Sequence, residues 1–287
     1  MMSEKEIVFL NGEFLKKEEA KISVFDRGFI FGDGIYEVVP VVNGKMVDKE
    51  DFWERFFRSL KSIKLEFPYE KLEFEYILQN LIIKNNVKEG GIYLQVTRGV
   101  SSRDFAFAKN IKPTIMCFVF ECEILNNPLK DKGISVVSVP DLRWKRRDIK
   151  SISLLGQCYA KEMAVEQKAD EAFLVENGLV NEGSSSSAFM IKDKTLIVKP
   201  ISNEILSGIR RKNILKFAKE LNLNVNERAF SIGEVYKADE VFISAATILI
   251  LPVISADKKL INNGKIGEFT KKLREKYVQN ILEQVKN

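Results

Sequence analysis

The sequence DRGFIFGDGIYEVVPVVNGK, residues 26–45, ends in a β-strand pattern and a tight turn. Residues 35–42 are rich in β-branched side chains, and Asn43-Gly44 is the dipeptide most typical of a two-residue hairpin. Asn11-Gly12 lies between the runs IVFL and EFL in the same way. The glycines around Asp33 lack the third glycine and the strand-then-helix context of a dinucleotide fingerprint. We therefore expect β-hairpins in this part of the chain and reject a Rossmann nucleotide-binding unit.

Two amphipathic helices and a long strand are expected next. Asp48, with Asp51 three residues on, is expected to cap the first helix. The apolar positions of this helix are Phe52, Phe56, Leu60 and Ile63, and those of a second helix over 74–85 are Phe74, Ile77, Leu78 and Leu81. The run GGIYLQVTRG, residues 90–99, then alternates. Its apolar face is expected in the core, with Tyr93 on the polar face.

The polar segment NNPLKDKG is the one stretch in mid-chain with the composition of a linker. It predicts an N-terminal domain over 1–125, a linker over 126–134 and a C-terminal domain over 135–287. The second half mixes strands and helices without strict βαβ alternation, which favours an α+β fold over a doubly wound sheet. We expect one of its helices to start at Ser207 and its last helix to carry Ile266, Phe269, Leu273, Tyr277 and Ile281.

The 287-residue chain contains no histidine. This absence excludes Ser/His/Asp and Cys/His nucleophile systems, the HExxH zinc site and His-ligated haem or copper. Proton transfer must then fall to Lys, Asp, Glu, Tyr or Cys, and a cofactor is the natural source of difficult chemistry. We expect no metal site.

The charge pattern and the cysteines indicate the partners and the compartment. Lys and Arg number 45 against 40 Asp and Glu, without a basic block, so small anionic molecules are expected partners rather than nucleic acid. Cys117, Cys122 and Cys158 form no CxxC pair and are expected to be buried, reduced thiols. The segment MMSEKEIVFL lacks the layout of a signal peptide, and the longest apolar stretch, 241–254, is shorter than the roughly 20 residues of a membrane span. We expect a cytoplasmic protein with no membrane association.

Lys150 and Glu182 are the first two candidate site residues. Lys150 precedes an amphipathic helix and has apolar neighbours, yet local context alone does not separate it from the other lysines. Glu182 lies in VNEGSSSSAF, directly after a predicted hairpin. This segment is either a flexible polar turn or a rigid loop that offers a buried acceptor together with hydroxyl and amide donors.

Two further features suit an anion. A helix capped by Ser207 would expose the amides of Gly208, Ile209 and Arg210, which is a typical phosphate-binding arrangement, although every capped helix has such amides. Arg55 interrupts an aromatic-rich helical surface, where its guanidinium is either solvated or paired with an anion.

Taken together, seven stretches in order resemble the class IV pyridoxal-phosphate (PLP) aminotransferases, and GDGIYEVV resembles their D-amino acid branch in particular. The resemblance extends from about residue 8 to residue 278. The stretches are DRGFIFGDGIYEVVPVVNGK, DFWERF, GGIYLQVTRGVSSR, DIKSISLLGQCYAK, VNEGSSSSAF, ILSGI and DEVFISAAT. This resemblance implies the two-domain PLP fold type IV, with a smaller N-terminal α/β domain and a larger, β-rich C-terminal domain.

The resemblance also implies roles for individual residues. Lys150 is the Schiff-base lysine and the acid and base of the reaction, and Glu182 is the partner of the pyridine nitrogen. Arg55 holds the cofactor phosphate, together with the amides of Ile209 and Arg210 and with Ala246. Tyr36 and Arg103 hold the substrate carboxylate, with Arg103 reaching in from the other subunit of a homodimer. The implied reaction is transamination of a D-amino acid, of the D-alanine type, with 2-oxoglutarate or another 2-oxo acid.

The sequence departs from the family pattern at two places. Phe105 stands where the D-amino acid branch has a histidine, so one donor to the carboxylate is missing, and Arg98 or Tyr93 is a candidate replacement. Hydroxyl residues usual around the phosphate are also replaced, by Arg210 after SGI and by Ala245-Ala246, with Thr247 one place along. The cofactor assignment does not depend on these positions, whereas the fine substrate specificity does.

Three alternatives remain open on the sequence. The first is a transaminase of the same fold that acts on L-branched-chain substrates or on (R)-amines. The second is an aminodeoxychorismate lyase, which uses the same lysine and glutamate but needs no amino acceptor. The third is a cofactor-binding or interaction domain without turnover, against which the presence of Lys150, Glu182 and Arg55 argues.

Overall fold

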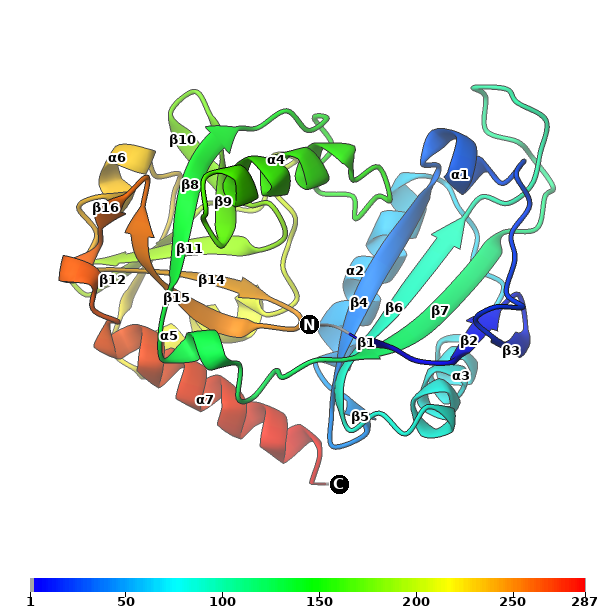
Figure 1. The fold of residues 1–287 in the computed structure, drawn as a ribbon, viewed down its shortest axis with the longest axis horizontal. Helices are drawn as coiled ribbons and strands as arrows, with labels where there is room; N and C mark the ends of the chain where they lie inside the picture. Colours follow the sequence, from blue (N-terminus) through cyan, green and yellow to red (C-terminus); the bar gives the residue numbers. More distant parts are fainter. Residues whose placement is uncertain (1–2, 287) are drawn as a thin grey trace. The chain divides into compact units, whose positions relative to one another are not determined.

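The computed structural model describes residues 3–286, and the chain separates into two compact units (Figure 1). The first unit takes the chain up to Ile124, together with Ile149–Ser153 and the residues from Gln284 onward. The second unit takes Leu125–Asp148 and Leu154–Glu283. The chain thus enters the second unit at Leu125, returns to the first unit over Ile149–Ser153, and then continues in the second. The returning segment carries Lys150.

The first unit is an antiparallel sheet with helices on one face. The strand order is β3-β2-β7-β6-β4-β5, and β1 pairs with β7. The strands are β1 Ser3–Glu4, β2 Ile7–Leu10, β3 Glu13–Lys16, β4 Gly34–Val42, β5 Lys45–Met46, β6 Glu89–Thr97 and β7 Thr114–Glu121. The helices are α1 Arg27–Phe31, α2 Lys49–Ser62 and α3 Lys71–Lys84.

The predicted hairpins and the alternation of the long strand are confirmed. Asn11-Gly12 joins β2 to β3 and Asn43-Gly44 joins β4 to β5, with all four residues at positive φ, as such turns require. Ile92, Leu94 and Val96 are buried in one core with the apolar residues of α2 and α3, and Tyr93 lies on the opposite face. The face of the sheet away from the helices is therefore the one that carries polar and aromatic side chains.

One predicted cap is wrong in detail. Helix α2 does follow Asp48, but the Asp48 side chain makes no capping hydrogen bond. Its backbone has a φ of 55°, its amide donates to Gln284 Oε1 at 2.7 Å, and its carboxylate accepts from Gln284 Nε2 at 3.2 Å. A contact with a distant part of the sequence has replaced the local cap.

The second unit is a mixed sheet with the strand order β10-β9-β8-β15-β14-β11-β12-β13, and β16 pairs with β15. Three pairs are parallel, namely β8 with β9, β8 with β15, and β12 with β13. The strands are β8 Ile134–Pro140, β9 Glu171–Glu176, β10 Leu179–Gly183, β11 Ser187–Lys192, β12 Thr195–Val198, β13 Asn224–Glu227, β14 Glu240–Ala245, β15 Leu249–Ala256 and β16 Lys259–Leu260. The helices are α4 Leu155–Glu166, α5 Arg211–Glu220, α6 Ile232–Val235 and α7 Glu268–Gln284, with 3₁₀ turns η1 Pro128–Lys130 and η2 Asn262–Gly264.

This sheet is buried on both faces. Val137 and Leu174 pack with Ala160 and Ala164 of α4, whereas Phe173, next to Leu174 in β9, lies in the core on the other face. Helices and mixed strands thus follow one another without a regular βαβ repeat, and the α+β class is confirmed.

Several helix starts and the burial of two cysteines differ from the sequence predictions. Helix α5 begins at Arg211 rather than after Ser207, because residues 207–210 form a turn in which the Arg211 amide donates to the Gly208 carbonyl oxygen. Helix α7 begins at Glu268, so Ile266 precedes it. The three cysteines are free thiols, but Cys122 is only half-buried, and Cys158 is exposed because it lies on the outer side of α4. Within residues 3–286, no helix is long and apolar enough to cross a membrane, and no cluster of acidic residues and cysteines suits a metal ion.

Candidate active site

Lys150 extends the sheet of the first unit at the free side of β4. The Tyr36 amide donates to the Lys150 carbonyl oxygen at 2.9 Å, and the Ile152 amide donates to the Gly34 carbonyl oxygen at 3.2 Å. From the other direction, the Lys150 amide donates to Ser59 Oγ of α2 at 3.3 Å. The backbone of Lys150 is therefore fixed by a strand and a helix, although the sequence places it in a loop.

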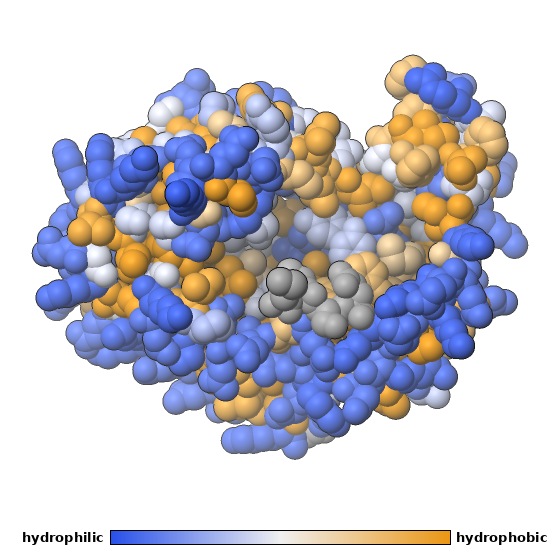
Figure 2. Space-filling model, in the orientation of Figure 1, coloured by the Kyte–Doolittle hydropathy of each residue, from blue (hydrophilic) through white to orange (hydrophobic). Residues whose placement is uncertain are grey.

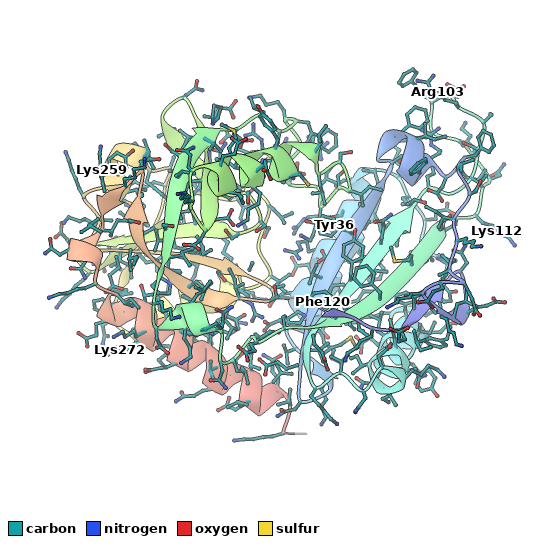
Figure 3. All side chains as sticks on the ribbon, in the orientation of Figure 1. Tyr36, Arg103, Lys112, Phe120, Lys259 and Lys272 are labelled. Atoms are coloured by element: carbon teal, nitrogen blue, oxygen red, sulfur yellow. The ribbon has the colours of Figure 1, made fainter. Side chains whose placement is uncertain are left out.

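The Lys150 side chain lies against an aromatic surface. Its Nζ atom is 4.1 Å from the centroid of the Tyr36 ring, which stacks on Tyr93, and Tyr93 stacks on Phe118 with 4.9 Å between centroids. These three rings come from β4, β6 and β7, on the face of the sheet away from α2 and α3. Figure 3 labels Tyr36 among them. Burial, together with Tyr36, raises the pKa of Tyr93, so this phenol stays neutral and donates to Gln95 Oε1 at 2.8 Å.

No acidic side chain among residues 3–286 forms an ion pair with Lys150. Lys150 is half-buried, and its amine makes a cation–π contact with the Tyr36 ring. An amine held in this way is placed to react with a carbonyl compound, because no salt bridge has to break first.

Arg55 is paired rather than solvated. Its Nε atom donates to Glu37 Oε1 at 2.8 Å and its Nη2 atom to Glu37 Oε2 at 2.6 Å, and both side chains are buried. Arg55 and Ser59 are one helical turn apart on α2, so the same face of this helix meets Glu37 and the backbone of Lys150. Tyr36 and Glu37 are neighbours in β4, and their side chains therefore lie on opposite faces of the sheet.

Arg103 lies apart from Tyr36 within the first unit (Figure 3). It is exposed on the segment between β6 and β7, with its guanidinium 5.6 Å from the Phe31 ring and 5.3 Å from the Phe105 ring. Phe105 is 78% exposed. One chain alone thus does not bring Arg103 and Phe105 to Tyr36.

Arg98 cannot replace the missing donor. It is buried, and its Nε and Nη2 atoms donate to the two carboxylate oxygens of Asp33 at 2.8 and 2.9 Å. Further bonds reach the carbonyl oxygens of Ile63 and Lys64. Burial raises the pKa of Asp33, but Arg98 and Arg27 outweigh this effect and lower it, so the pair is ionised. Arg98 anchors the segment between β6 and β7.

Glu182 is a buried carboxylate in the second unit, and a β-bulge in β10 determines the face of the sheet on which its side chain lies. Val180 pairs with Val175 and Glu182 with Leu174, so the register shifts between them and they lie on opposite faces of the sheet. Glu182 Oε1 accepts a bond of 2.6 Å from Arg143 Nη1, and the Leu206 amide lies 3.2 Å from each carboxylate oxygen. Burial raises the pKa of Glu182, and Arg143 opposes this increase.

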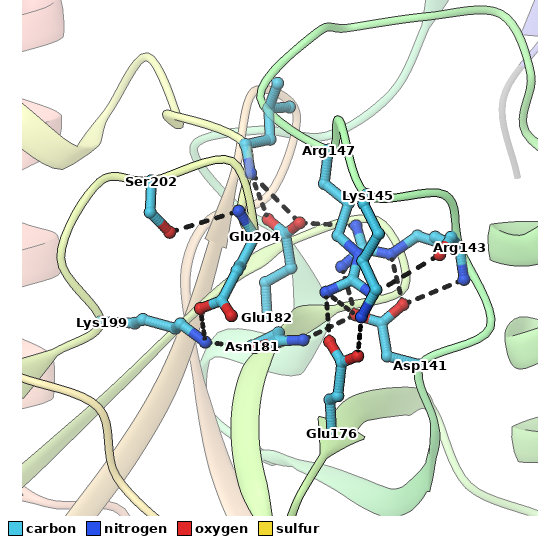
Figure 4. A network of polar contacts seen from close by, with 11 residues as sticks. Asp141, Arg143, Lys145, Arg147, Glu176, Asn181, Glu182, Lys199, Ser202 and Glu204 are labelled. Atoms are coloured by element: carbon cyan, nitrogen blue, oxygen red, sulfur yellow. Dashed lines mark hydrogen bonds and ion pairs between the residues drawn. The ribbon is translucent and has the colours of Figure 1, made fainter.

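Arg143 belongs to a chain of ion pairs (Figure 4). Asp141 accepts from Arg143 Nε and Nη2 at 2.9 and 2.8 Å, from Asn181 Nδ2 at 2.8 Å, and pairs with Arg147 at 3.3 Å. Arg147 in turn donates to Glu176 at 2.8 Å. Arg143 is thus held from one end by Asp141 and presents its other end to Glu182.

The four serines after Glu182 form a rigid loop, not a flexible turn. Glu171 is buried at the start of β9, and its carboxylate accepts from the hydroxyls of Ser184, Ser185 and Ser186. The Ser184 amide also donates to the Ala172 carbonyl oxygen at 2.9 Å. The sequence analysis missed Glu171, Arg143, Asp141 and Glu37. A charged residue in an otherwise apolar strand was the available signal for Glu37 and Glu171, and it does not identify the partner. Asp141 and Arg143 lie in the loop after β8 and carried no such signal.

The remaining predicted residues lie in the second unit, on two neighbouring turns. Ile209 and Arg210 are buried just before α5, and Ala246 follows β14. Arg210 Nε donates to the Ala245 carbonyl oxygen at 3.0 Å, and its Nη2 atom donates to the Ala246 carbonyl oxygen. Tyr36, Arg55 and Lys150 thus belong to the first unit, and Ile209, Arg210, Ala246 and Glu182 to the second.

Comparisons with known proteins identify the family of the chain. Residues 34–256 match the family model described as Amino-transferase class IV. The chain is 41% identical over 278 residues to a D-alanine aminotransferase of Staphylococcus aureus (strain N315), covering 96% of this chain and 98% of that one. It is 34% identical over 279 residues to the D-alanine aminotransferase of Bacillus licheniformis, with the same shares covered.

Solved structures show the same fold. The branched-chain amino acid aminotransferase of T.th., complexed with N-(5'-phosphopyridoxyl)-L-glutamate, has a TM-score of 0.90 at 24% identity, covering 98% of this chain and 96% of that one. The branched-chain amino acid aminotransferase from Escherichia coli has a TM-score of 0.87 at 23% identity, covering 96% and 94%. The chain belongs to the class IV aminotransferase family.

Proposed function

We propose that this aminotransferase uses PLP to transfer the amino group of a D-amino acid, D-alanine above all, to 2-oxoglutarate or another 2-oxo acid. The observation that carries the proposal is the Lys150 amine, whose backbone is fixed by Tyr36 and Ser59 and which has no acidic partner among the described residues. The D-alanine aminotransferases that the chain resembles over nearly their full length supply the substrate class.

The side chains suit the chemical groups of PLP. Lys150 offers a primary amine for its aldehyde, and Glu182 offers a buried carboxylate, already held by Arg143 and the Leu206 amide, for its pyridine nitrogen. Arg55 offers a guanidinium fixed by Glu37, and the backbone amides of Ile209, Arg210 and Ala246 offer neutral donors. An amine, a carboxylate and a set of anion donors are the three partners that this cofactor needs.

When bound, PLP supplies an electron sink that stabilises negative charge at the substrate Cα atom. The residues of the chain do the rest. Lys150 Nζ accepts the proton from the substrate Cα atom and later returns a proton, so that one amine serves as base and acid. Arg143 favours the ionised form of Glu182, and this carboxylate in turn favours a proton on the pyridine nitrogen. Tyr36 and Arg103 bind the substrate carboxylate. This division of labour needs no histidine.

Arg103 is proposed to come from a second copy of the chain, which makes the enzyme a homodimer. The support is an exposed apolar surface around α1 and the segment between β6 and β7, which Figure 2 shows as a group of hydrophobic residues. It comprises Ile22, Val24, Phe25, Phe29, Val100, Phe105 and Phe107. Backbone bonds from Arg27 to Gly99 and from Ser101 to Phe25 join its two segments. A patch of this kind is typical of an interface.

The proposed function is tested by incubating the purified protein with PLP, 2-oxoglutarate and D-alanine, and by measuring pyruvate and glutamate. Equal amounts of both products are expected, with much less from L-alanine. Preference for L-leucine or for an (R)-amine would support the alternative substrates, and pyruvate from aminodeoxychorismate without an acceptor would indicate the lyase. A cytoplasmic location stays a prediction from the sequence.

The homodimer is tested separately by sedimentation. Phe29→Asp places a charge on a side chain that is 72% exposed in the single chain, so it should shift the protein to monomers without unfolding it. Leu72→Asp, at an exposed position of α3, is the matched control and should leave the dimer intact. An unchanged dimer in the Phe29→Asp variant would exclude this surface as the interface.

A further inference from the structure

Arg210 is one of the largest fully buried side chains of the chain, and it occupies a place where the family has a hydroxyl residue. It is 1% exposed. Its guanidinium donates to the carbonyl oxygens of Ala245 and Ala246, and so joins the turn 207–210 to the turn that follows β14. The two alanines are themselves the other positions at which usual hydroxyls are missing. Three departures from the family pattern thus meet in one cluster of contacts.

We propose that Arg210 builds the phosphate-binding site of this enzyme, by orienting the amides of the 245–247 turn and by placing a fixed positive charge behind them, in place of hydroxyl donors. This inference rests on the proposed use of PLP and deepens it. In this account Arg210 is a positioning residue that acts on the phosphate through the turn, because its Nε and Nη2 atoms donate to protein carbonyl oxygens.

The geometry of the peptide units sets the direction of the amides in the 245–247 turn. In a trans peptide unit the C=O and N–H bonds point in opposite directions, and no described peptide bond of the chain is cis. Because the carbonyl oxygens of Ala245 and Ala246 point toward Arg210, the N–H groups of Ala246 and Thr247 point away from it. Two successive amides that face the same side form an anion-binding concavity. The Ile248 amide donates to the same Ala245 carbonyl oxygen at 3.4 Å, whereas Arg210 binds both carbonyl oxygens. Arg210 therefore helps to fix the orientation in which this turn can bind a phosphate through its backbone.

A second arginine binds the chain just after the same turn. Arg274 of α7 donates to the carbonyl oxygens of Ile248 at 2.9 Å and Ile250 at 2.6 Å. The Arg210 guanidinium also lies 4.9 Å from the ring of Tyr277, which is three residues after Arg274 on α7. Two buried guanidinium groups thus bind four carbonyl oxygens between residues 245 and 250.

The two buried arginines, Arg210 and Arg274, repel each other electrostatically. Burial, followed by the charge of Arg210, lowers the pKa of Arg274 to about 10. The two cations therefore oppose each other within a poorly solvated region. A dianionic phosphate on the amide side of the turn would relieve this repulsion, because charges interact strongly where the effective dielectric constant is low.

The turn 207–210 has little room to move. A Cβ atom at Gly208 would lie 2.7 Å from Ser187 Oγ, so this turn packs directly on the start of β11. Arg210 thus connects the 245–247 turn to a fixed support. The hydroxyl donors of the usual arrangement would contact the ligand themselves, whereas this arginine acts through the backbone.

The test compares PLP with pyridoxal, which forms the same bond to Lys150 but has no phosphate. Dissociation constants of both are measured by absorbance titration of the apoenzyme for the wild type and for Arg210→Met. The variant should bind PLP about tenfold or more weakly, which corresponds to about 1.4 kcal/mol, and pyridoxal with less than about a twofold change. Arg211→Met is the matched control, because Arg211 is the next residue and pairs with Glu227 rather than with the turn.

A rescue experiment separates positioning from general damage to the fold. Arg210→Thr should lose PLP affinity, and adding Ala246→Thr should restore part of it by supplying hydroxyl donors. Arg210→Lys should fall between wild type and Arg210→Met, because it keeps the charge but not the forked geometry. Equal losses of PLP and pyridoxal affinity, or no loss of either, would overturn the proposal.

Inorganic phosphate makes this test independent of the proposed function. Phosphate alone should raise the unfolding temperature of the wild-type apoenzyme and have a much smaller effect on Arg210→Met. If the wild type binds PLP but does not use D-alanine, the substrate assignment fails while the inference on Arg210 stands. If phosphate stabilises both proteins equally, the inference fails whatever the substrate is.

Discussion

Arg143 Nη1 donates to Glu182 Oε1 across 2.6 Å, and both side chains are buried. Asp141 fixes the Arg143 guanidinium by accepting two further hydrogen bonds from it. Since burial of a carboxylate carries a desolvation cost, Arg143 is the group that favours the ionised form of Glu182 and holds its side chain in place.

Removal of this arginine should therefore affect stability and cofactor binding together. Arg143→Met leaves the carboxylates of Glu182 and Asp141 without their shared cation, and such a break in a buried pair costs about 3–5 kcal/mol of unfolding free energy. The pKa of Glu182, already raised by burial, should increase further, and PLP affinity should fall. Urea unfolding and PLP titration measure the two effects. Arg146→Met, at an exposed pair in the same loop, should change stability by less than about 1 kcal/mol.

Glu171 should prove as important as the serines it binds. Glu171→Ala removes the acceptor of three serine hydroxyls in the loop after Glu182 and of the Ala172 amide in β9, and each buried donor left without a partner costs about 1–3 kcal/mol. We expect a loss of at least about 2 kcal/mol in urea unfolding, together with weaker PLP binding. Glu162→Ala, at an exposed position of α4, should lie within about 0.5 kcal/mol of the wild type. A stable Glu171→Ala variant with normal PLP affinity would show that the serine loop does not need this carboxylate.

Lys150→Ala should abolish turnover and the covalent attachment of the cofactor. A positioned acid or base alone accounts for a factor of about 10²–10⁴ in rate, and Lys150 is proposed to serve as base, acid and attachment point. The measurements are kcat with D-alanine and the mass of the protein after treatment with PLP and borohydride. The exposed Lys132→Ala variant should match the wild type in both. Borohydride-stable attachment that persists in Lys150→Ala would move the assignment to another lysine.

Glu176 should give the protein part of its acid sensitivity. Hydrogen bonds from Lys145 and Arg147 lower the pKa of Glu176 to about 2, from 4.5. A carboxyl whose pKa is lower in the folded state stabilises the protein above its unfolded pKa, and this contribution is lost as the pH falls from about 4.5 toward 2. Glu176→Gln should therefore be less stable than the wild type at pH 7, and the difference should disappear near pH 2. Urea midpoints across this range, with and without about 1 M salt, measure the effect, which salt should reduce. A difference that does not change with pH would contradict the ionic account.

The sequence predicted the elements well where the signal was local. The hairpins at Asn11-Gly12 and Asn43-Gly44 and the alternation around Tyr93 depend on neighbouring residues, and all three are confirmed. Asp48 does precede α2 at the predicted N-cap position, but its side chain binds Gln284, from a distant part of the sequence, instead of capping the helix. The cap at Ser207 was wrong, because a separate turn precedes α5.

The sequence could not predict which residues pair with one another in the site. Arg143 and Glu182 are separated by 39 positions, and Glu37 and Arg55 by 18. The bulge at Asn181, which turns Glu182 to the face opposite Val180, also has no local signal. The resemblance to the family could identify Lys150 and Glu182, but only the structure shows which residues hold them.

The most direct test of the central claim is the absorption spectrum of the purified protein with PLP, recorded alone, then with D-alanine, then with L-alanine, each without a 2-oxo acid. We predict a yellow protein whose cofactor band is bleached by D-alanine and left largely unchanged by L-alanine. A protein that stays colourless after incubation with PLP would contradict the roles of Lys150 and Glu182. Bleaching by L-alanine alone would keep the site and contradict the proposed D-amino acid specificity.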